Sequence, residues 1–402
     1  MKACLEKPFE IMRRKDGSEY SNDIIQNWYK ARAYVLDKLK GVEIGPSSRE
    51  HLHVVVEGDS PLMLSVVRQV ALSAHYANYD EENPDETKRN RTVITFVSQK
   101  DDILDLLKKE EYLGNLLDYC KYSFKGITYN KDSYIDVEFR FVNSWEGEES
   151  EFVKKMTVAN VVAFLKGKKE EEIQCIDIRK AVLAGRMYDL GTLIDNLPAE
   201  DIHCAKRYVM ALDVFQHDML RKPIEEKEKG KERKKEEEKK ENEKRKKKAL
   251  ENVFCADGFE SRAKGIKQYC KEVNEKRKKN KEKLMKEEEA WAENNEALSV
   301  SEHARWVVEK LIMGFRPLSN DERLEDEQRF GQAKKQYRKD LKDRKKDPAH
   351  IDLCSYADLR RISPEDMKYD SFLMLAIPKI LRKVENNSLC SAKRLRKHAR
   401  TN

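Results

Sequence analysis

The sequence predicts an α/β protein with a charged helical connector and a small, mainly helical α+β unit near its C-terminal end. Short apolar runs alternate with helical patterns in the first half, charge dominates residues 225–248, and capped helical patterns occur after residue 299. We expect five segments: a helical extension at 1–50, an α/β domain at 51–222, a connector at 223–290, the C-terminal unit at 291–386 and a basic tail at 387–402.

Composition limits the classes of protein to consider. The 402 residues carry a net charge of only +7, because 81 basic and 74 acidic side chains nearly cancel, which argues against a dedicated nucleic-acid binder. The eight cysteines are scattered, as expected for free thiols in a reducing compartment. No apolar run approaches the roughly 20 residues that span a bilayer. We therefore expect a cytoplasmic protein that does not enter a membrane.

The beginning of the α/β domain has the pattern of a βαβ unit. Residues 52–58 form an apolar run that ends in Gly58 and predicts a strand. Ser60 and Pro61 then predict the start of a helix, and residues 92–98 predict a second strand. The charge and apolar periodicities predict further elements: helices at 21–40, 101–119, 179–194 and 201–220, and strands at 134–142, 158–165 and 173–178. The strand at 134–142 alternates apolar and charged residues, which favours an edge strand or one with a single wet face.

This region resembles the TrkA-N type of Rossmann domain, so the resemblance implies a Rossmann-like fold. A dinucleotide site uses a Gly-x-Gly-x-x-Gly loop, which lets the backbone approach the pyrophosphate. The loop at Gly58, Asp59 and Ser60 keeps only the first glycine. We therefore expect a Rossmann-like scaffold without its cofactor, with NAD(P) binding at these three residues as the weaker alternative.

The connector and the tail are charged segments without a clear apolar stripe. Acidic and basic residues mix between Glu225 and Lys248, which favours an exposed helical spacer over RNA or membrane-surface contact. Apolar residues return briefly at 250–270 before another lysine-rich run. We expect the whole stretch 223–289 to be exposed, and the basic tail to be solvated.

The stretch from Ser299 to Ile380 carries the most specific signals. Ser299 and Glu302 have the spacing of a capping box, and Gly314 stands where a left-handed C-cap is needed. One face of this helix is apolar and predicts a core contact: Ala304, Val307, Val308, Leu311 and Phe315. A second row contains His303, Trp306, Lys310 and Met313. Trp306 is then either a core anchor or the floor of a ligand pocket.

The stretch resembles the ryanodine-receptor (Ryr) repeat domain that also occurs as a single copy in bacterial and phage proteins. The motif positions are Glu302, His303, Trp306, Glu309, Lys310, Gly314, Phe315, Arg316, His350, Leu353, Tyr356, Leu359, Pro364, Glu365, Lys368, Tyr369 and Asp370. The resemblance implies recognition of a nucleotide-like molecule, with Trp306 and Phe315 suited to a base, and Lys310 or Arg316 suited to a phosphate. Glu309, His350 and Tyr356 complete the implied site.

Two further features of this stretch bear on the site. A charged insertion at 321–348 separates the two halves of the motif. Ser363 and Pro364 predict the start of a second helix, and Pro378 predicts its bend or end. The core face of this helix is expected to consist of Phe372, Leu373, Leu375, Ala376, Ile380 and Leu381.

The sequence shows no nucleophile, base and orienting group in a recognisable pattern, which favours a protein that is not an enzyme. The leading hypothesis is a ligand-sensing protein whose Ryr-like unit binds a nucleotide-like molecule. The alternative is an interaction scaffold, in which the aromatic face docks a partner or a second copy to form a homodimer. A degenerate NAD(P)-linked enzyme is the third hypothesis.

Overall fold

The protein is described from a computed structural model. The residues that the structure describes are 31–32, 35–36, 39, 42–57, 61–85, 88–97, 103–109, 113, 115–142, 162–166, 256–344, 346–379 and 381–382. The predicted elements at 173–178, 179–194 and 201–220, the charged segment 225–248, the loop at 58–60 and the basic tail lie outside these residues.

A mixed six-stranded sheet forms the centre of the α/β body, in the order β4-β3-β5-β2-β1-β6. The strands are β1 (Leu52–Glu57), β2 (Thr92–Val97), β3 (Lys121–Phe124), β4 (Ile127–Tyr129), β5 (Val137–Val142) and β6 (Val162–Lys166). β1, β2, β5 and β3 run parallel, whereas β4 and β6 are antiparallel edge strands. Helix α3 (Pro61–Ser73) connects β1 to β2, which confirms the predicted βαβ opening.

Strand β5 does not lie at an edge, so the first of the two interpretations of its alternation, an edge strand, is wrong. It pairs with β2 on one side and β3 on the other. Its acidic residues are buried because they have partners from other segments: the Glu138 carboxylate lies 3.4 Å from Lys121 Nζ. The preceding Asp136 accepts hydrogen bonds of 2.8 and 2.9 Å from His75 Nδ1. Buried carboxylates need such partners, and single-sequence alternation cannot reveal them.

Two local features between the strands differ from expectation. The helix predicted at 101–119 is interrupted and forms α4 (Ile103–Lys109) and α5 (Leu116–Tyr119). The β3–β4 hairpin was not predicted. Its turn has positive φ at Lys125 (49°) and Gly126 (78°), as a tight two-residue hairpin requires.

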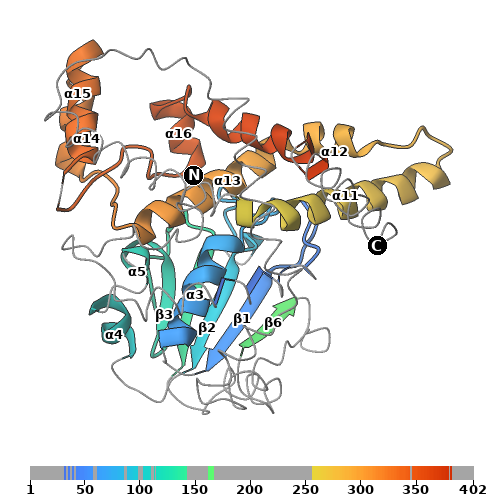
Figure 1. The fold of residues 1–402 in the computed structure, drawn as a ribbon, viewed down its shortest axis with the longest axis horizontal. Helices are drawn as coiled ribbons and strands as arrows, with labels where there is room; N and C mark the ends of the chain where they lie inside the picture. Colours follow the sequence, from blue (N-terminus) through green and yellow to red (C-terminus); the bar gives the residue numbers. More distant parts are fainter. Residues whose placement is uncertain are drawn as a thin grey trace, which may run out of the picture.

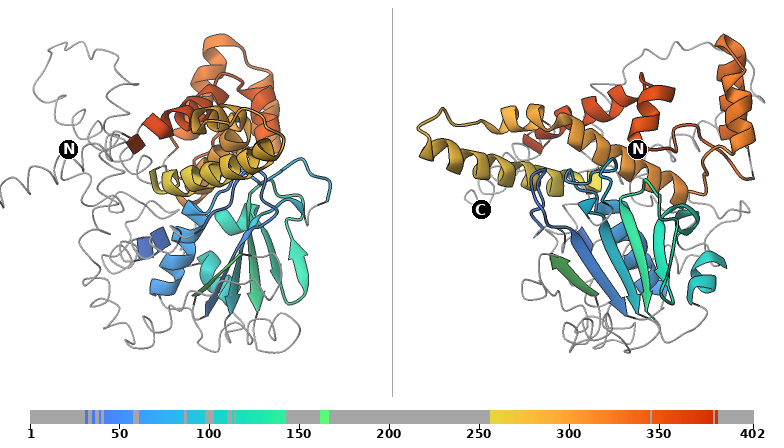
Figure 2. Two further views of the ribbon diagram at one scale, coloured as in Figure 1. Left: turned by 90° about the vertical axis from the view of Figure 1, so that its right-hand side faces the viewer. Right: turned by 180° about the vertical axis from the view of Figure 1, so that it is seen from behind.

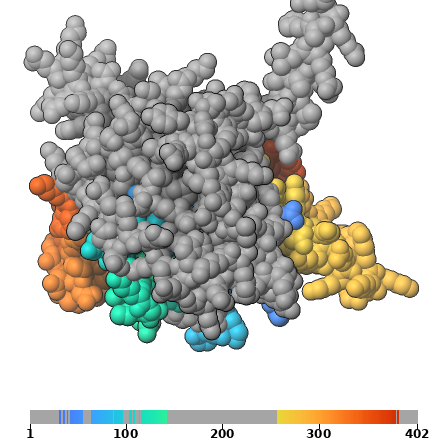
Figure 3. All heavy atoms as spheres, turned by 90° about the horizontal axis from the view of Figure 1, so that it is seen from below, coloured from blue at the N-terminus to red at the C-terminus, as the bar shows by residue number. Residues whose placement is uncertain are grey.

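A layer of helices covers the amino ends of the parallel strands (Figure 1). It contains α11 (Phe259–Lys279), α12 (Glu287–Glu293), α13 (Asn295–Ile312), α14 (Asn320–Glu327), α15 (Gly331–Lys342), α16 (Tyr356–Ile362) and a last helical segment that includes residues 367–379. Figure 2 shows α11 extending beyond the sheet on one side. Figure 3 shows from below that the segment of α14 and α15 (orange) and that of α11 (yellow) lie at opposite sides of the molecule.

The helical layer shares a hydrophobic core with the sheet. Val307, Val308 and Leu311 of α13 belong to the same buried cluster as Ile94 and Phe139. Main-chain contacts reinforce this packing, because the Asn115 backbone N–H donates to Leu311 O and its side-chain amide donates to Phe315 O (3.2 and 2.9 Å). The segment boundary at 290/291 stays a prediction, but α13 completes the core of the α/β body.

The first half of α11 is buried, so the expectation of an exposed connector is wrong for residues 256–266. Phe259 and Ile266 pack in a second core cluster with Trp291, Met374 and Ile377. The sequence signal was the brief return of apolar residues after 250, which provides this helix with a core-facing side.

Two helix predictions require correction. Helix α13 begins at Asn295, and Ser299 lies inside it, where its hydroxyl donates to Asn295 O (2.7 Å) instead of capping the helix. Residues 364–366 form a turn, and helical residues follow from 367. Met374 is fully buried, whereas Phe372 is 53% and Leu375 is 47% exposed. The predicted core face is therefore wrong for Phe372 and Leu375, whereas Leu373, Ala376 and Leu381 pack against the second core cluster as expected.

Gly265 marks a close approach between α11 and the segment before β1. A Cβ at this position would lie 2.4 Å from the carbonyl oxygen of Ile44. We expect Gly265→Ala to lower the free energy of unfolding by about 1–3 kcal/mol, because two backbones must separate. Urea denaturation measures this change, and Lys271→Ala, on an exposed position of the same helix, provides the control. Equal stability of both variants would contradict the close packing.

Candidate functional site

Helix α13 positions the candidate site on the face next to its core face. The helix ends at a left-handed Gly314 with φ +88°, as predicted from the sequence, and Phe315 follows it into the core. The predicted core residues Ala304, Val307, Val308, Leu311 and Phe315 are all buried. His303 and Lys310 are also buried, whereas Trp306 and Met313 are partly exposed.

The structure brings five of the predicted residues into one aromatic cluster: His303, Trp306, Phe315, His350 and Tyr356. The rings of His303 and Trp306 stack at 5.9 Å and 21°, and His350 meets Trp306 edge-on at 5.0 Å and 78°. Tyr356 lies 5.6 Å from His303, and Phe315 lies 6.4 Å from His350. These centroid distances lie within the range of favourable aromatic contacts. Trp306 is thus at the centre of the cluster.

The insertion at 321–348 folds as α14 and α15 and returns the chain to the cluster. The backbone N–H of Arg316 donates to Pro348 O and that of His350 donates to Arg316 O, both at 3.0 Å. This bridge places His350 beside Phe315. The loop that follows is held by His303 Nε2, which donates to Cys354 O at 2.9 Å. The insertion therefore positions the second half of the motif instead of separating the two halves.

The α/β body also holds this loop. Glu81 accepts hydrogen bonds from the backbone N–H groups of Tyr356 and Ala357, at 3.1 and 2.8 Å, and thereby caps α16. The Tyr134 hydroxyl donates to Leu353 O at 2.9 Å. The cluster consequently lies against the amino edge of the sheet and depends on both halves of the chain.

Both histidines of the cluster are neutral at pH 7. Burial lowers the pKa of His303 to about 4. Burial and the neighbouring cations Lys342 and Lys310 lower the pKa of His350 to about 3. Because His303 Nε2 donates to Cys354 O, its Nδ1 is the unprotonated nitrogen, and this atom lies 3.8 Å from Asp370 Oδ2. Burial also raises the pKa of Asp370.

The cluster contains a cation close to its central ring. Lys310 Nζ lies 5.6 Å from the Trp306 ring centroid, within the range of a cation–π contact. It also lies 3.1 Å from Glu309 Oε1. Glu309 is therefore the counter-ion of Lys310. Its expected contact with a ligand stays a prediction.

Glu309 belongs to a buried ion-pair chain that the sequence did not reveal: Arg262, Glu302, Arg305, Glu309 and Lys310. Arg262 Nη2 lies 3.0 Å from Glu302, Arg305 lies 2.9 Å from Glu302 and 2.6 Å from Glu309. All five residues are at most 5% exposed. The spacing of three and four residues along α13 was the available signal, but such spacing is typical of a solvated helix face. Only the covering layer explains why these charges are buried.

Arg316 is engaged by carboxylates. Its guanidinium donates to Glu322 at 2.6 and 3.0 Å and to Asp347 at 2.7 Å. The hydrogen bonds from Arg316 lower the pKa of Glu322 to about 2. Both partners come from the insertion, so a phosphate at Arg316 would have to replace them. Lys310 is likewise paired with a carboxylate, but it is the cation that lies beside the Trp306 ring.

The described residues do not include the predicted phosphate loop, and they show no cluster of metal ligands and no membrane-spanning helix. Gly58, Asp59 and Ser60 lie outside them, so the predicted phosphate loop stays a prediction. No group of three or more potential metal ligands occurs in the described part of the chain. None of its helices combines the length and apolar character needed to cross a bilayer.

Comparison with known proteins assigns no family, because no family model, curated protein or solved structure matches the chain. The resemblance to Ryr domains thus rests on the motif residues, and the resemblance to TrkA-N domains rests on the order of the predicted strands and helices.

Proposed function

We propose that this chain is a cytoplasmic, non-enzymatic ligand-sensing protein that binds a nucleotide-like molecule at Trp306. The observation that carries the proposal is the partly exposed ring of Trp306 inside an otherwise largely buried aromatic cluster, with the Lys310 ammonium 5.6 Å from its centroid. A partly exposed indole held by neighbouring rings offers a base a preorganised stacking surface, and a nearby ammonium suits a phosphate.

The ligand chemistry follows from the charges around the ring. Lys310 is paired with Glu309, so a phosphate would compete with that carboxylate for the ammonium. The neutral His303 and His350 add aromatic ring surface that suits a base but carry no positive charge for a phosphate, which leaves Lys310 as the cation of the cluster. This combination favours a base-bearing phosphate over a free inorganic anion, in agreement with the resemblance to Ryr domains.

The α/β body is proposed to receive the signal. Its parallel strands β1 and β2 with α3 between them support a Rossmann-like (TrkA-N-like) scaffold. Glu81 and Asn115 of this body hydrogen-bond the segments that carry the cluster. A ligand that orders Trp306 and its neighbours therefore acts on contacts made by both halves. NAD(P) binding at Gly58, Asp59 and Ser60 remains the alternative for an enzyme.

A thermal-shift panel on the full chain tests the proposal. Full-length protein is required, because α13 belongs to the core of the α/β body. We expect at least one nucleotide or dinucleotide to raise the melting temperature, and Trp306→Ala to abolish the shift by removing the stacking surface. Phe330→Ala, at a 79% exposed aromatic outside the cluster, is the matched control and should retain it. A shift by NAD or NADP that survives Trp306→Ala would favour the enzyme hypothesis.

One observation favours the scaffold alternative. Tyr369, Phe372 and Leu375 are 70%, 53% and 47% exposed and follow one another at helical spacing on the last helix. Such a row can dock a partner or a second copy. If no nucleotide shifts the melting temperature while Phe372→Glu converts a dimer to a monomer in sedimentation equilibrium, this function replaces the first.

A further inference from the structure

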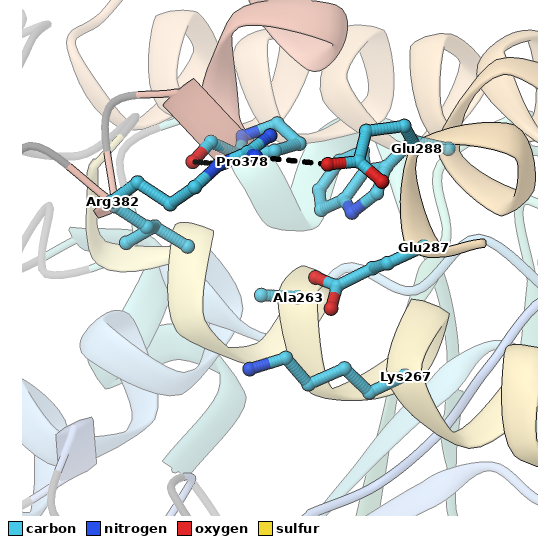
Figure 4. A pocket seen from close by; sticks show the side chains of 8 residues that line it. Ala263, Lys267, Glu287, Glu288, Pro378 and Arg382 are labelled. Carbon is cyan, nitrogen blue, oxygen red and sulfur yellow. Dashed lines mark hydrogen bonds and ion pairs between the residues drawn. The ribbon is translucent and has the colours of Figure 1, made fainter.

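A cavity separate from the aromatic cluster lies between α11, α12 and the end of the last helix (Figure 4). Its volume is about 170 Å³. Trp291, Pro378 and Leu381 provide apolar lining. An apolar cavity of about 150 Å³ accommodates a benzene ring, so this one has room for a molecule of about that size or slightly larger.

Four charged side chains surround the cavity: Lys267, Glu287, Glu288 and Arg382. Glu288 and Arg382 satisfy each other through a 2.8 Å hydrogen bond across one side, as Figure 4 shows. On the other side, Lys267 extends from α11 and Glu287 from the first turn of α12, with Ala263 near them. Within the described residues these two side chains make no hydrogen bond or ion pair with the protein.

A third group in the lining has no partner in the described part of the chain. The indole N–H of Trp291 is buried without a hydrogen-bond acceptor, although Trp291 is only 2% exposed. A buried donor without an acceptor destabilises the folded protein, because the group has lost its hydrogen bond to water. An acceptor inside the cavity is the kind of group that would satisfy it.

We infer that this cavity binds a small zwitterion of the α-amino-acid type with an apolar side chain. The four surrounding charges sum to zero, so a ligand of zero net charge fits them. Its ammonium pairs with Glu287, its carboxylate pairs with Lys267 and offers oxygens to the Trp291 N–H, and its side chain packs on Pro378 and Leu381. A purely anionic ligand would leave Glu287 without a partner of opposite charge, and a purely cationic ligand would leave Lys267 without one.

The test uses leucine as the probe and the full-length protein. Saturation-transfer NMR or calorimetry is expected to show saturable binding in the millimolar range. Two analogues each lack one charge: leucine amide lacks the carboxylate, and 4-methylpentanoate lacks the ammonium. Each should bind about two- to five-fold more weakly, the range expected for one partly exposed ion pair.

Variants locate the site. Lys267→Met and Glu287→Gln are each expected to weaken leucine binding by the same two- to five-fold. Lys271→Met, one turn along α11 from Lys267 and outside the cavity lining, is the control and should bind as the wild type does. The inference is overturned if leucine binding does not saturate, if both analogues bind as tightly as leucine, or if the two cavity variants match the control. Because the analogue series needs only wild-type protein, it decides the question even if a variant fails to fold.

Discussion

Replacing Arg305 by alanine is expected to lower the free energy of unfolding by about 3–5 kcal/mol, the largest effect of any substitution proposed for this protein. Arg305 is the centre of the buried ion-pair chain and contacts both Glu302 and Glu309. Its removal takes from the buried carboxylates of Glu302 and Glu309 the cation that they share, while Arg262 and Lys310 remain beside them. The penalty arises because a buried charge that loses a partner cannot regain its hydration.

Urea denaturation followed by circular dichroism measures this effect. Arg360→Ala is the control, because Arg360 forms an ion pair with Glu296 on the surface, where both side chains are more than half exposed. Exposed pairs contribute at most about 1 kcal/mol. If the two variants lose equal stability, then α13 is not covered as described, and the candidate site loses its structural support.

Lowering the pH from 7 to 4.5 is expected to destabilise the wild type by about 2–3 kcal/mol through His350 alone. The folded pKa of His350, about 3, lies below the unfolded value of 6.5. The unfolded chain therefore binds the proton first, so stability is present above pH 6.5 and is lost as the pH falls toward 3. His303, with a pKa of about 4, acts in the same direction.

Acidic groups whose pKa is raised in the folded protein stabilise it as the pH falls. A variant is therefore needed to separate the contribution of His350 from theirs. Burial raises the pKa of Asp370, which favours the folded protein as the pH falls. The His350→Phe variant keeps an aromatic ring beside Trp306 and keeps the contribution of Asp370 to the pH dependence of stability. It removes only the contribution of His350. We expect the loss of stability between pH 7 and 4.5 to be about 2–3 kcal/mol smaller in the variant. An identical loss in both proteins would show that His350 is not buried as a neutral ring.

The elements of the α/β body were predictable because their signals are local. β1 and β2 are short apolar runs, and the left-handed Gly314 and the apolar face of α13 follow from spacing along one helix. The hairpin at Lys125 and Gly126 also had a local signal, because polar and apolar residues alternate on both sides of its glycine turn.

The remaining differences come from contacts between distant segments. The acidic residues around β5 indicate an exposed edge until His75 and Lys121 are known to pair with them. Charges spaced along α13 indicate a solvated face until α11 supplies Arg262. Convergence of His303 and His350 on Trp306 depends on the bridge between Arg316 and Ala349, which closes an insertion of two helices. The resemblance to Ryr domains pointed to the residues of the cluster, but not to these partners.

Calorimetric titration of the full chain and of Trp306→Ala with the nucleotide that gives the largest thermal shift tests the central claim most directly. The proposed function predicts saturable, one-to-one binding to the wild type and its loss in the variant, with unchanged circular dichroism showing that the variant is folded. Absence of saturable heat from any nucleotide, or equal affinity in both proteins, would contradict the claim that Trp306 forms a ligand site.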